Sequence, residues 1–182
     1  MEVNAGCWDM VAPESAMYYA SIASLRDTLR NQSISSCQDV EQHCNVYEMS
    51  VVRVYCPRTC GCDDPSSSLA LPYPRTGCPM SCLSTSTYTT VLEHFPCIDI
   101  PKHELVSSRT WMDLTDNIMT STATWGQYRD HYQTTAKIMK EHGCDAVEIV
   151  GTNLSDDICV PFTLKSVALF CPISCQCSTI GA

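Results

Sequence analysis

The sequence lacks the residues and runs on which several classes of protein depend. No stretch approaches the roughly 18 consecutive apolar residues that a transmembrane helix needs. Lysine and arginine number 11 against 20 aspartates and glutamates, a formal net charge of −9 at pH 7, so no basic stripe is present to attract nucleic acid. With only seven glycines in 182 residues, the chain also has no glycine-rich loop for a phosphate. We therefore expect neither nucleic-acid nor nucleotide binding.

Sequence motifs of common enzymes and metal sites are also missing. His103-Glu104 begins like a zinc-protease helix, but Ser107 stands where a second histidine would complete the metal site. No Gly-x-Ser-x-Gly motif occurs, and no Cys-x-x-Cys pair of the kind that lowers a thiol pKa. The acid pairs Asp63-Asp64 and Asp156-Asp157 lack the spacing of a calcium loop, so solvated loop acids are expected there. We expect no catalytic residue, no metal and no cofactor.

Cysteine, by contrast, is abundant: the chain has 14, an even number. The spacing C-x11-C-x3-C-x-C closes one segment at residues 44–62 and another at residues 159–177. One further cysteine, Cys37 or Cys144, precedes each segment. Each unit opens with a similar tetrapeptide, Cys7-Trp8-Asp9-Met10 or Cys97-Ile98-Asp99-Ile100. This internal repeat predicts two cysteine-rich modules in tandem.

The cysteine usage also indicates a compartment. Three thiolates spaced C-x3-C-x-C could bind zinc or copper, but apolar neighbours suited to packing favour disulfides. Because disulfides persist only outside reducing compartments, we expect a secreted or cell-surface protein, or one of an organellar lumen such as the thylakoid. The opening Met1-Glu2-Val3-Asn4 has neither the basic nor the apolar region of a signal peptide, so residue 1 is expected to begin a processed stretch.

Composition divides the chain into four parts. Residues 1–62 form a first module, residues 97–177 a second, and residues 178–182 a short tail. Residues 63–96 between the modules are rich in Pro, Ser and Thr, which are poor in helix or strand interiors, so they are predicted as a linker. The linker carries Cys78 and Cys82, whose close spacing predicts a local disulfide.

Apolar periodicity predicts helices and gives little sign of sheet. One face in the first module predicts a helix that ends before Asn31: Tyr18, Ile22, Leu25 and Leu29. The longer second module has two such patterns before Gly143: Trp111, Leu114, Ile118, and then Trp125, Tyr128, Tyr132, Ala136, Met139. The closing segments are predicted to be helical on the faces Met49, Val52, Cys56 and Leu164, Val167, Cys171. The expected fold is small, disulfide-rich and mainly α.

Two kinds of surface site are predicted. The aromatic side chains of Trp111, Trp125, Tyr128 and Tyr132 are more typical of a buried core, but in a chain with a limited core they could form a docking face for a protein partner. Two Asn-x-Ser sequons, at Asn31 and Asn153, are predicted in loops. They would carry glycans only if the chain passes through the secretory pathway.

The closing segment of the first module, Met49 followed by Cys56-Pro57-Arg58-Thr59-Cys60-Gly61-Cys62, resembles the end of the ShKT (sea-anemone-toxin-like) domain. The opening Cys97-Ile98-Asp99 is similar to the start of that domain. The resemblance covers the cysteine frame and the closing helices. The last cysteine pair is one residue tighter than in the family, and the gap after the first cysteine is several times longer.

The resemblance implies a disulfide pairing. The family joins its first cysteine to the sixth, the second to the fourth and the third to the fifth. Carried over, this gives Cys7–Cys62, Cys37–Cys56 and Cys44–Cys60 in the first module and Cys97–Cys177, Cys144–Cys171 and Cys159–Cys175 in the second. Cys78–Cys82 would complete seven disulfides.

The resemblance also implies candidate functions. Potassium-channel block in the family uses a Lys-Tyr pair, but the matching positions here are Ser50-Val51 and Lys165-Ser166, and Lys165 is expected to be a solvated helix residue. Cys-Gly-Cys, a Pro/Ser linker and Gly-Cys-Pro resemble repeats in large proteins of unicellular algae. We expect a non-enzymatic structural or protein-interaction module within a larger assembly. The alternatives are a lumenal accessory subunit, peripherally docked on a membrane complex such as an algal photosystem, and a secreted channel- or receptor-binding ligand.

Overall fold

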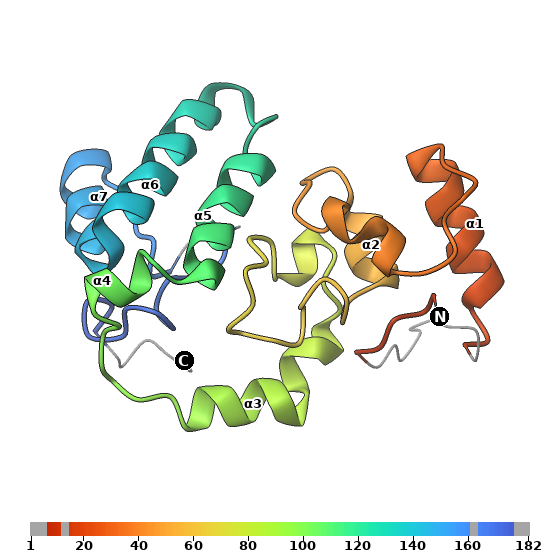
Figure 1. The fold of residues 1–182 in the computed structure, drawn as a ribbon, viewed down its shortest axis with the longest axis horizontal. Coiled ribbons are helices and arrows are strands. Elements are labelled where there is room, and N and C mark those ends of the chain that lie inside the picture. The colour runs from red at the N-terminus through yellow and green to blue at the C-terminus, as the bar shows by residue number, and fades with distance from the viewer. Residues whose placement is uncertain (1–6, 12–14, 161–163, 177–182) are drawn as a thin grey trace.

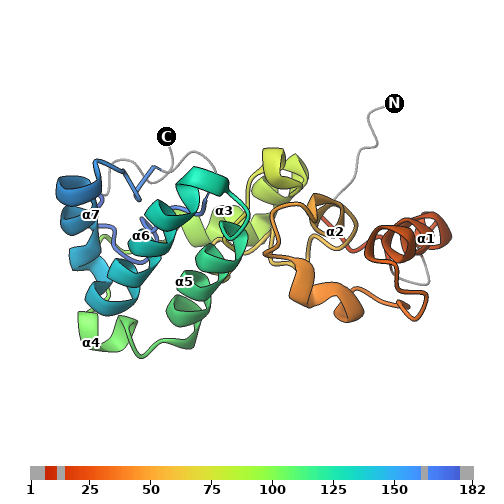
Figure 2. The same cartoon turned by 90° about the horizontal axis from the view of Figure 1, so that it is seen from above.

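The chain folds into two groups of helices joined by an irregular segment (Figure 1). The computed structural model describes residues 7–11, 15–160 and 164–176, and over these ranges it contains helices and no strand. The helices α1 and α2 lie at one end of the molecule and α4 to α7 at the other, as a view from above also shows (Figure 2). The predicted small, disulfide-rich, mainly α fold is therefore confirmed.

The first half is built around one amphipathic helix and a short closing helix. Helix α1, Tyr18–Leu29, buries Ile22 and Leu25 on the predicted face. The 3₁₀ helix η1, Gln38–His43, and helix α2, Ser50–Tyr55, follow. Leu25, Val40 and Val52 are buried together with the cysteines of this half. The half thus has a hydrophobic cluster of its own, cross-linked by its disulfides.

The second half is a helical group packed around Trp111. Its elements are α4 (Lys102–Leu105), α5 (Arg109–Ser121), η4 (Gly126–Tyr128), α6 (Arg129–His142), η5 (Gly143–Asp145) and α7 (Ala146–Leu154). The two predicted patterns correspond to α5 and α6, although Trp125 and Tyr128 lie before α6 begins. Helix α7 was not predicted.

The predicted closing helix of the second half is wrong. From Leu164 to Cys171 the described chain forms turns and bends. The N–H of Lys165 donates to the Ala70 carbonyl (2.9 Å) and the N–H of Val167 donates to the Ile158 carbonyl (3.1 Å). Because these donors bind other segments, they cannot hold the successive hydrogen bonds of a helix.

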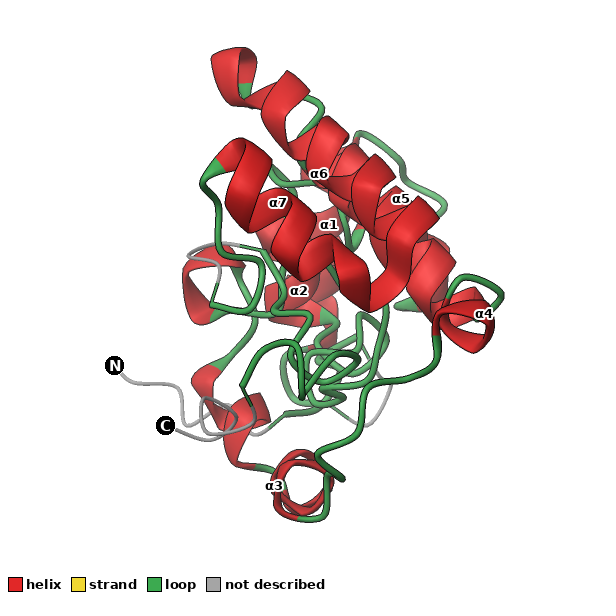
Figure 3. Ribbon diagram, turned by 90° about the vertical axis from the view of Figure 1, so that its left-hand side faces the viewer, coloured by secondary structure: helices red, strands yellow, loops and turns green. Residues whose placement is uncertain are grey.

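The segment predicted as a linker, because its residues are poor in helix or strand interiors, contains three short helices. They are η2 (Pro74–Thr76), η3 (Met80–Ser84) and α3 (Ser86–Glu93). Helix α3 begins where the Thr85 hydroxyl accepts a hydrogen bond from the Tyr88 N–H (3.2 Å), the N-cap contact that favours helix initiation. It buries none of its residues and lies away from the labelled helices α1, α2 and α4 to α7 (Figure 3). The cap explains a helix where the Ser/Thr composition predicted none.

A short part of the linker passes between the two halves. We call residues 67–71 the crossing segment. Leu69 is buried in the cluster of the first half, whereas Ala70 and Leu71 are buried in the cluster of the second half. Side chains of consecutive residues thus enter both cores, so the crossing segment belongs to both halves.

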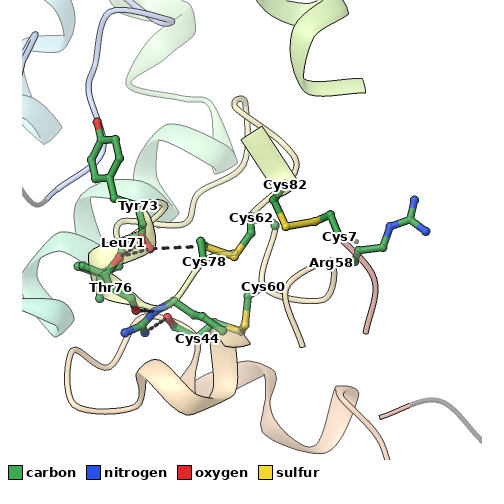
Figure 4. Close-up of a disulfide and its surroundings, with 12 residues drawn as sticks. Cys7, Cys44, Arg58, Cys60, Cys62, Leu71, Tyr73, Thr76, Cys78 and Cys82 are labelled. Carbon is green, nitrogen blue, oxygen red and sulfur yellow. Dashed lines mark hydrogen bonds between the residues drawn. A yellow bond between two sulfur atoms is a disulfide. The ribbon is translucent and has the colours of Figure 1, made fainter. Parts of the chain in front are cut away.

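Four of the predicted disulfides are confirmed: Cys37–Cys56, Cys44–Cys60, Cys144–Cys171 and Cys159–Cys175. Two are wrong, because the structure pairs Cys7 with Cys82 and Cys62 with Cys78 (Figure 4). Cys97 is disulfide-bonded, and its predicted partner Cys177 lies outside the described residues. No free cysteine is found among those described, so none of them offers a thiolate that could bind zinc or copper.

The exchanged pairing changes the role of the linker. A local Cys78–Cys82 disulfide would have left residues 63–96 tethered only at their ends. Instead Cys78 and Cys82 each bind a cysteine of residues 1–62, so the first part of the linker is fastened to the first half.

Gly77 approaches α2 so closely that an added Cβ would lie 2.4 Å from the Ser50 carbonyl oxygen, and its φ of +109° also favours glycine.

Candidate functional site at the junction of the two halves

The two opening tetrapeptides make matching contacts with the two closing turns. Asp9 accepts hydrogen bonds from the backbone N–H groups of Arg58 and Thr59 and from the Thr59 hydroxyl (2.8, 3.1 and 2.7 Å). In the second half, Asp99 accepts from the N–H groups of Ile173 and Ser174 and from the Ser174 hydroxyl (2.7, 3.2 and 2.6 Å). Each carboxylate thus satisfies the donors of one closing turn.

Asp9→Asn and Asp99→Asn should each lower the free energy of unfolding by about 1 kcal/mol, because an amide replaces a charge-assisted acceptor. Urea denaturation of the oxidised protein measures this. Asp27→Asn, in α1, is the matched control because its side chain has no hydrogen bond or ion pair with the residues that the structure describes; it should change stability by less than about 0.5 kcal/mol. Equal losses for all three variants would contradict the capping role.

A fully buried arginine joins the first half to the linker. The Arg53 guanidinium, on α2, donates to the backbone carbonyls of Cys44, Val46, Tyr47 and Thr76 (2.6, 2.9, 3.0 and 2.5 Å). Burial lowers the pKa of Arg53 to about 10, partly offset by Tyr47 and Glu48. The side chain therefore stays charged at neutral pH.

Thr76, which accepts one of the Arg53 hydrogen bonds, forms further hydrogen bonds within the linker. The Thr76 hydroxyl lies 2.8 Å from the Leu71 carbonyl oxygen and 2.7 Å from that of Tyr73 (Figure 4). Since one hydroxyl carries one proton, it donates to one of these carbonyls at a time. The network thus reaches from α2 through η2 to the crossing segment.

A buried lysine joins the second half to the same linker. The Lys165 side chain is 5% exposed, and its amino group donates to the backbone carbonyl of Ser67. Burial lowers the pKa of Lys165 to about 7, and Asp64 partly offsets this effect. The prediction of a solvated lysine is therefore wrong. An arginine of the first half and a lysine of the second thus hold the linker by its backbone oxygens.

Polar side chains complete the junction around the crossing segment. The Asn45 amide oxygen accepts from the Ala70 N–H (2.8 Å), and the Asn117 amide donates to the Ser68 carbonyl (2.8 Å). The Ser121 hydroxyl donates to the Asn45 carbonyl (2.6 Å). These contacts connect α5 directly to the loop that follows η1, so they fix the halves relative to each other.

An aromatic cluster lies beside these polar contacts. The Trp125 ring contacts Tyr47 of the first half (centroids 5.2 Å apart, planes at 78°) and Tyr132 of α6 (5.0 Å, 88°). A cavity of about 320 Å³ opens here, lined by Tyr47, Glu48, Thr124, Trp125 and Tyr128. The Trp125 indole N–H is buried and makes no hydrogen bond with any described residue, so packing of the rings holds the indole in place.

The structure separates the four residues of the predicted docking face. Trp111 is fully buried and its indole N–H donates to the Met139 carbonyl (3.1 Å), so its assignment to a docking face is wrong. Trp125 and Tyr132 are half-buried, and Tyr128 is 57% exposed. Tyr47 of the first half covers part of this group. Most of the aromatic side chains predicted for this face therefore pack against other residues of the same chain.

The other predicted surface residues are exposed. Asn31 follows α1, and its amide oxygen accepts from the Ser33 N–H and hydroxyl (3.0 and 2.7 Å). Asn153 is exposed but lies in the last turn of α7, not in a loop. No group of histidines, cysteines and acids that could hold a metal is found over the described ranges. The Asp156 carboxylate lies 3.1 Å from the His131 ring.

Sequence reasoning missed the two buried cations and the residues Asn45, Tyr47 and Glu48. Arg53 had one usable signal, since it interrupts the apolar run Val51-Val52-Arg53-Val54 on a predicted helix. Such a position predicts either an exposed face or a buried charge with several acceptors. Lys165 carries no comparable signal, because the comparison with the channel-blocking pair predicts nothing about burial. The three loop residues carry no motif.

These disulfides make the chain a protein of an oxidising, extracytoplasmic environment. None of the described helices is both long and apolar enough to span a bilayer. No protein-family model, curated protein or solved structure matches this chain.

Proposed function

We propose that this chain is a non-enzymatic interaction protein of two ShKT-like modules, which works as part of a larger assembly. The observation that carries the proposal is the exposure of two apolar side chains at matching places. Trp8 is 50% exposed and Ile98 is 66% exposed, and each immediately precedes the aspartate that caps a closing turn. Isolated exposed apolar residues are common, but each of these two lies between a disulfide-bonded cysteine and a capping aspartate, which restrict its backbone.

The buried cations support a structural rather than a catalytic use of charge. Arg53 and Lys165 have strongly lowered pKa values, a property that often marks functional groups. Both are shielded from solvent and donate to backbone carbonyls. Burial of Lys165 also weakens the channel-blocking alternative, because a blocking lysine has to reach outward. Rigid presentation of surface residues fits this arrangement best.

Size-exclusion chromatography of tagged protein in extracts of the native source tests the proposal. The wild-type chain should elute with a larger assembly, whereas the double variant Trp8→Ser/Ile98→Ser should elute as a free chain, because the apolar contacts are lost. Tyr19→Ser is the matched control, since Tyr19 is 84% exposed on α1. A wild-type chain that elutes alone would contradict the proposal.

The finer form of the proposal is an accessory subunit docked on a membrane complex in an organellar lumen, such as an algal photosystem. The same sample tests it through the mass of the intact protein. Asn31 and Asn153 are both exposed, so passage through the secretory pathway should add glycans. Co-sedimentation with membranes and an unmodified mass would support the lumenal subunit. A glycosylated chain free of membranes would favour a secreted binding protein.

A further inference from the structure

The cavity beside Trp125 has the composition of a site for an organic cation. Three of its five lining residues are aromatic, and Glu48 is the one charged residue among them. The face of an aromatic ring carries a negative potential that attracts cations, most strongly for tryptophan. A carboxylate next to such faces adds to the attraction. The net charge of −9 also favours the approach of cations.

The rings form a corner rather than a flat surface. The planes of Tyr47 and Trp125 meet at 78°, and Tyr128 follows Trp125 by three residues, across η4. Rings set at right angles can surround a rounded cation from more than one side. The volume of about 320 Å³ lies at the lower end of the roughly 300–1,000 Å³ of small-molecule sites, which suits a small group.

The hydrogen bonding in the cavity selects among cations. The Thr124 hydroxyl already donates to the Glu48 carboxylate, so one acceptor oxygen is partly used. A primary ammonium keeps strong hydration and seeks three acceptors. A trimethylammonium group carries its charge on methyl groups and donates no such hydrogen bonds. Its apolar surface matches the rings, and Glu48 supplies the opposite charge.

We propose that this cavity binds a trimethylammonium group, as found in choline and related headgroups. Tyr47 and Glu48 come from the first half, whereas Thr124, Trp125 and Tyr128 come from the second. The site therefore exists only when the halves are docked. Because ligand binds the docked form alone, binding stabilises the junction and raises the melting temperature. This inference concerns a ligand site and stands whether or not the larger assembly is found.

Titration of the full, oxidised chain with choline chloride tests the site. The indole N–H resonance of Trp125, identified by its loss in Trp125→Phe, should shift saturably. The probe for charge is 3,3-dimethyl-1-butanol, a neutral compound of nearly the same shape as choline. Its binding should be at least about tenfold weaker if the cation–ring attraction drives recognition. Equal shifts for both compounds, or no saturable shift with choline, would overturn the proposal.

Variants assign the binding to the cavity. Tyr128→Ala and Glu48→Gln should each weaken choline binding by about threefold or more, while the far-UV circular dichroism spectrum without ligand stays unchanged. Both residues are exposed, so neither change removes core packing. Tyr19→Ala and Glu93→Gln are the matched controls on the exposed surfaces of α1 and α3. Variants of the cavity that bind choline like the wild type would overturn the assignment.

Vesicle flotation identifies the source of the group. If the site takes a lipid headgroup, the protein should float with phosphatidylcholine vesicles, should not float with phosphatidylglycerol vesicles, and should lose flotation in Glu48→Gln. Choline binding without flotation assigns the site to a free small molecule. Flotation that is equal for both lipids and insensitive to Glu48→Gln, in the absence of choline binding, would reflect membrane partitioning and overturn the site.

Discussion

Arg53→Met is expected to lower the free energy of unfolding by about 3 to 5 kcal/mol. The methionine keeps much of the apolar volume of the arginine stem. It leaves four carbonyl oxygens without the guanidinium that they share in the folded state. A buried acceptor left without a partner costs about 1 to 3 kcal/mol, and local rearrangement recovers part of the total.

Urea denaturation of the oxidised protein measures this loss. Arg58→Met is the matched control, because the Arg58 side chain is 63% exposed and its contact with Asp63 is a surface ion pair, worth at most about 1 kcal/mol. If Arg53→Met does not fold, Arg53→Lys provides the measurement. Lysine keeps the charge but loses the planar fork of donors, so an intermediate loss is expected. An Arg53→Met variant within about 1 kcal/mol of wild type would contradict the role described above.

The free energy of unfolding is expected to rise by about 2 kcal/mol between pH 7 and pH 9, because of Lys165. The folded pKa of Lys165 is about 7, whereas an unfolded lysine titrates near its ordinary value of about 10.4. In this interval the unfolded chain binds a proton that the folded chain has released. A rise in pH disfavours the state that binds more protons, which here is the unfolded chain, so the free energy of unfolding increases. Below pH 7 both states bind the proton and the slope disappears.

The three partly buried tyrosines do not titrate in this interval. Burial raises the pKa of Tyr73, Tyr88 and Tyr132 above that of an ordinary tyrosine, so these side chains stay neutral to pH 9. Lys165→Met should remove most of the slope. Lys102→Met should keep it, because the Lys102 side chain is 50% exposed. Urea denaturation at each pH provides the measurement. A flat profile in the wild type, or an unchanged slope in Lys165→Met, would refute the assignment.

Periodicity predicted the long helices well, because their burial is local to one face. Ile22 and Leu25 of α1 and Leu114 and Ile118 of α5 are buried as expected. Periodicity failed at residues 164–171, where the pattern of Leu164, Val167 and Cys171 indicated a helix. There the backbone of Lys165 pairs with Ala70, a contact between residues far apart in sequence. Local spacing carries no information about such a partner.

The disulfide pairing shows a second limit. The pairing implied by the family resemblance is correct for four disulfides, two in each half. Neither the resemblance nor the spacing could select among the three ways of pairing the four cysteines Cys7, Cys62, Cys78 and Cys82, since connectivity does not follow from sequence alone. The resemblance predicted Cys7–Cys62 without regard to the linker cysteines, and the close spacing of Cys78 and Cys82 predicted a local disulfide; both predictions are wrong.

The candidate site was predicted only in part. Trp125 and Tyr128 were predicted as core residues or, alternatively, as part of a docking face for a protein partner, and both line the cavity. Tyr47 and Glu48 were missed because they lie in an irregular loop whose position depends on the docking of the halves. Trp111 was misassigned because a pattern of large aromatic residues does not distinguish a core from a surface. Three-dimensional packing resolves that ambiguity.

The closure of four disulfides within residues 7–82 has a consequence for biosynthesis. Every cysteine of the first half finds its partner before residue 83, so during N-terminal-first translocation this part can oxidise fully before the later cysteines emerge. The first half then presents a finished surface, with the crossing segment held inside the Cys62–Cys78 loop. Residues of the second half, including Lys165, fold against this template. Such an order limits mispairing between the halves, because early thiols are already consumed when late ones arrive.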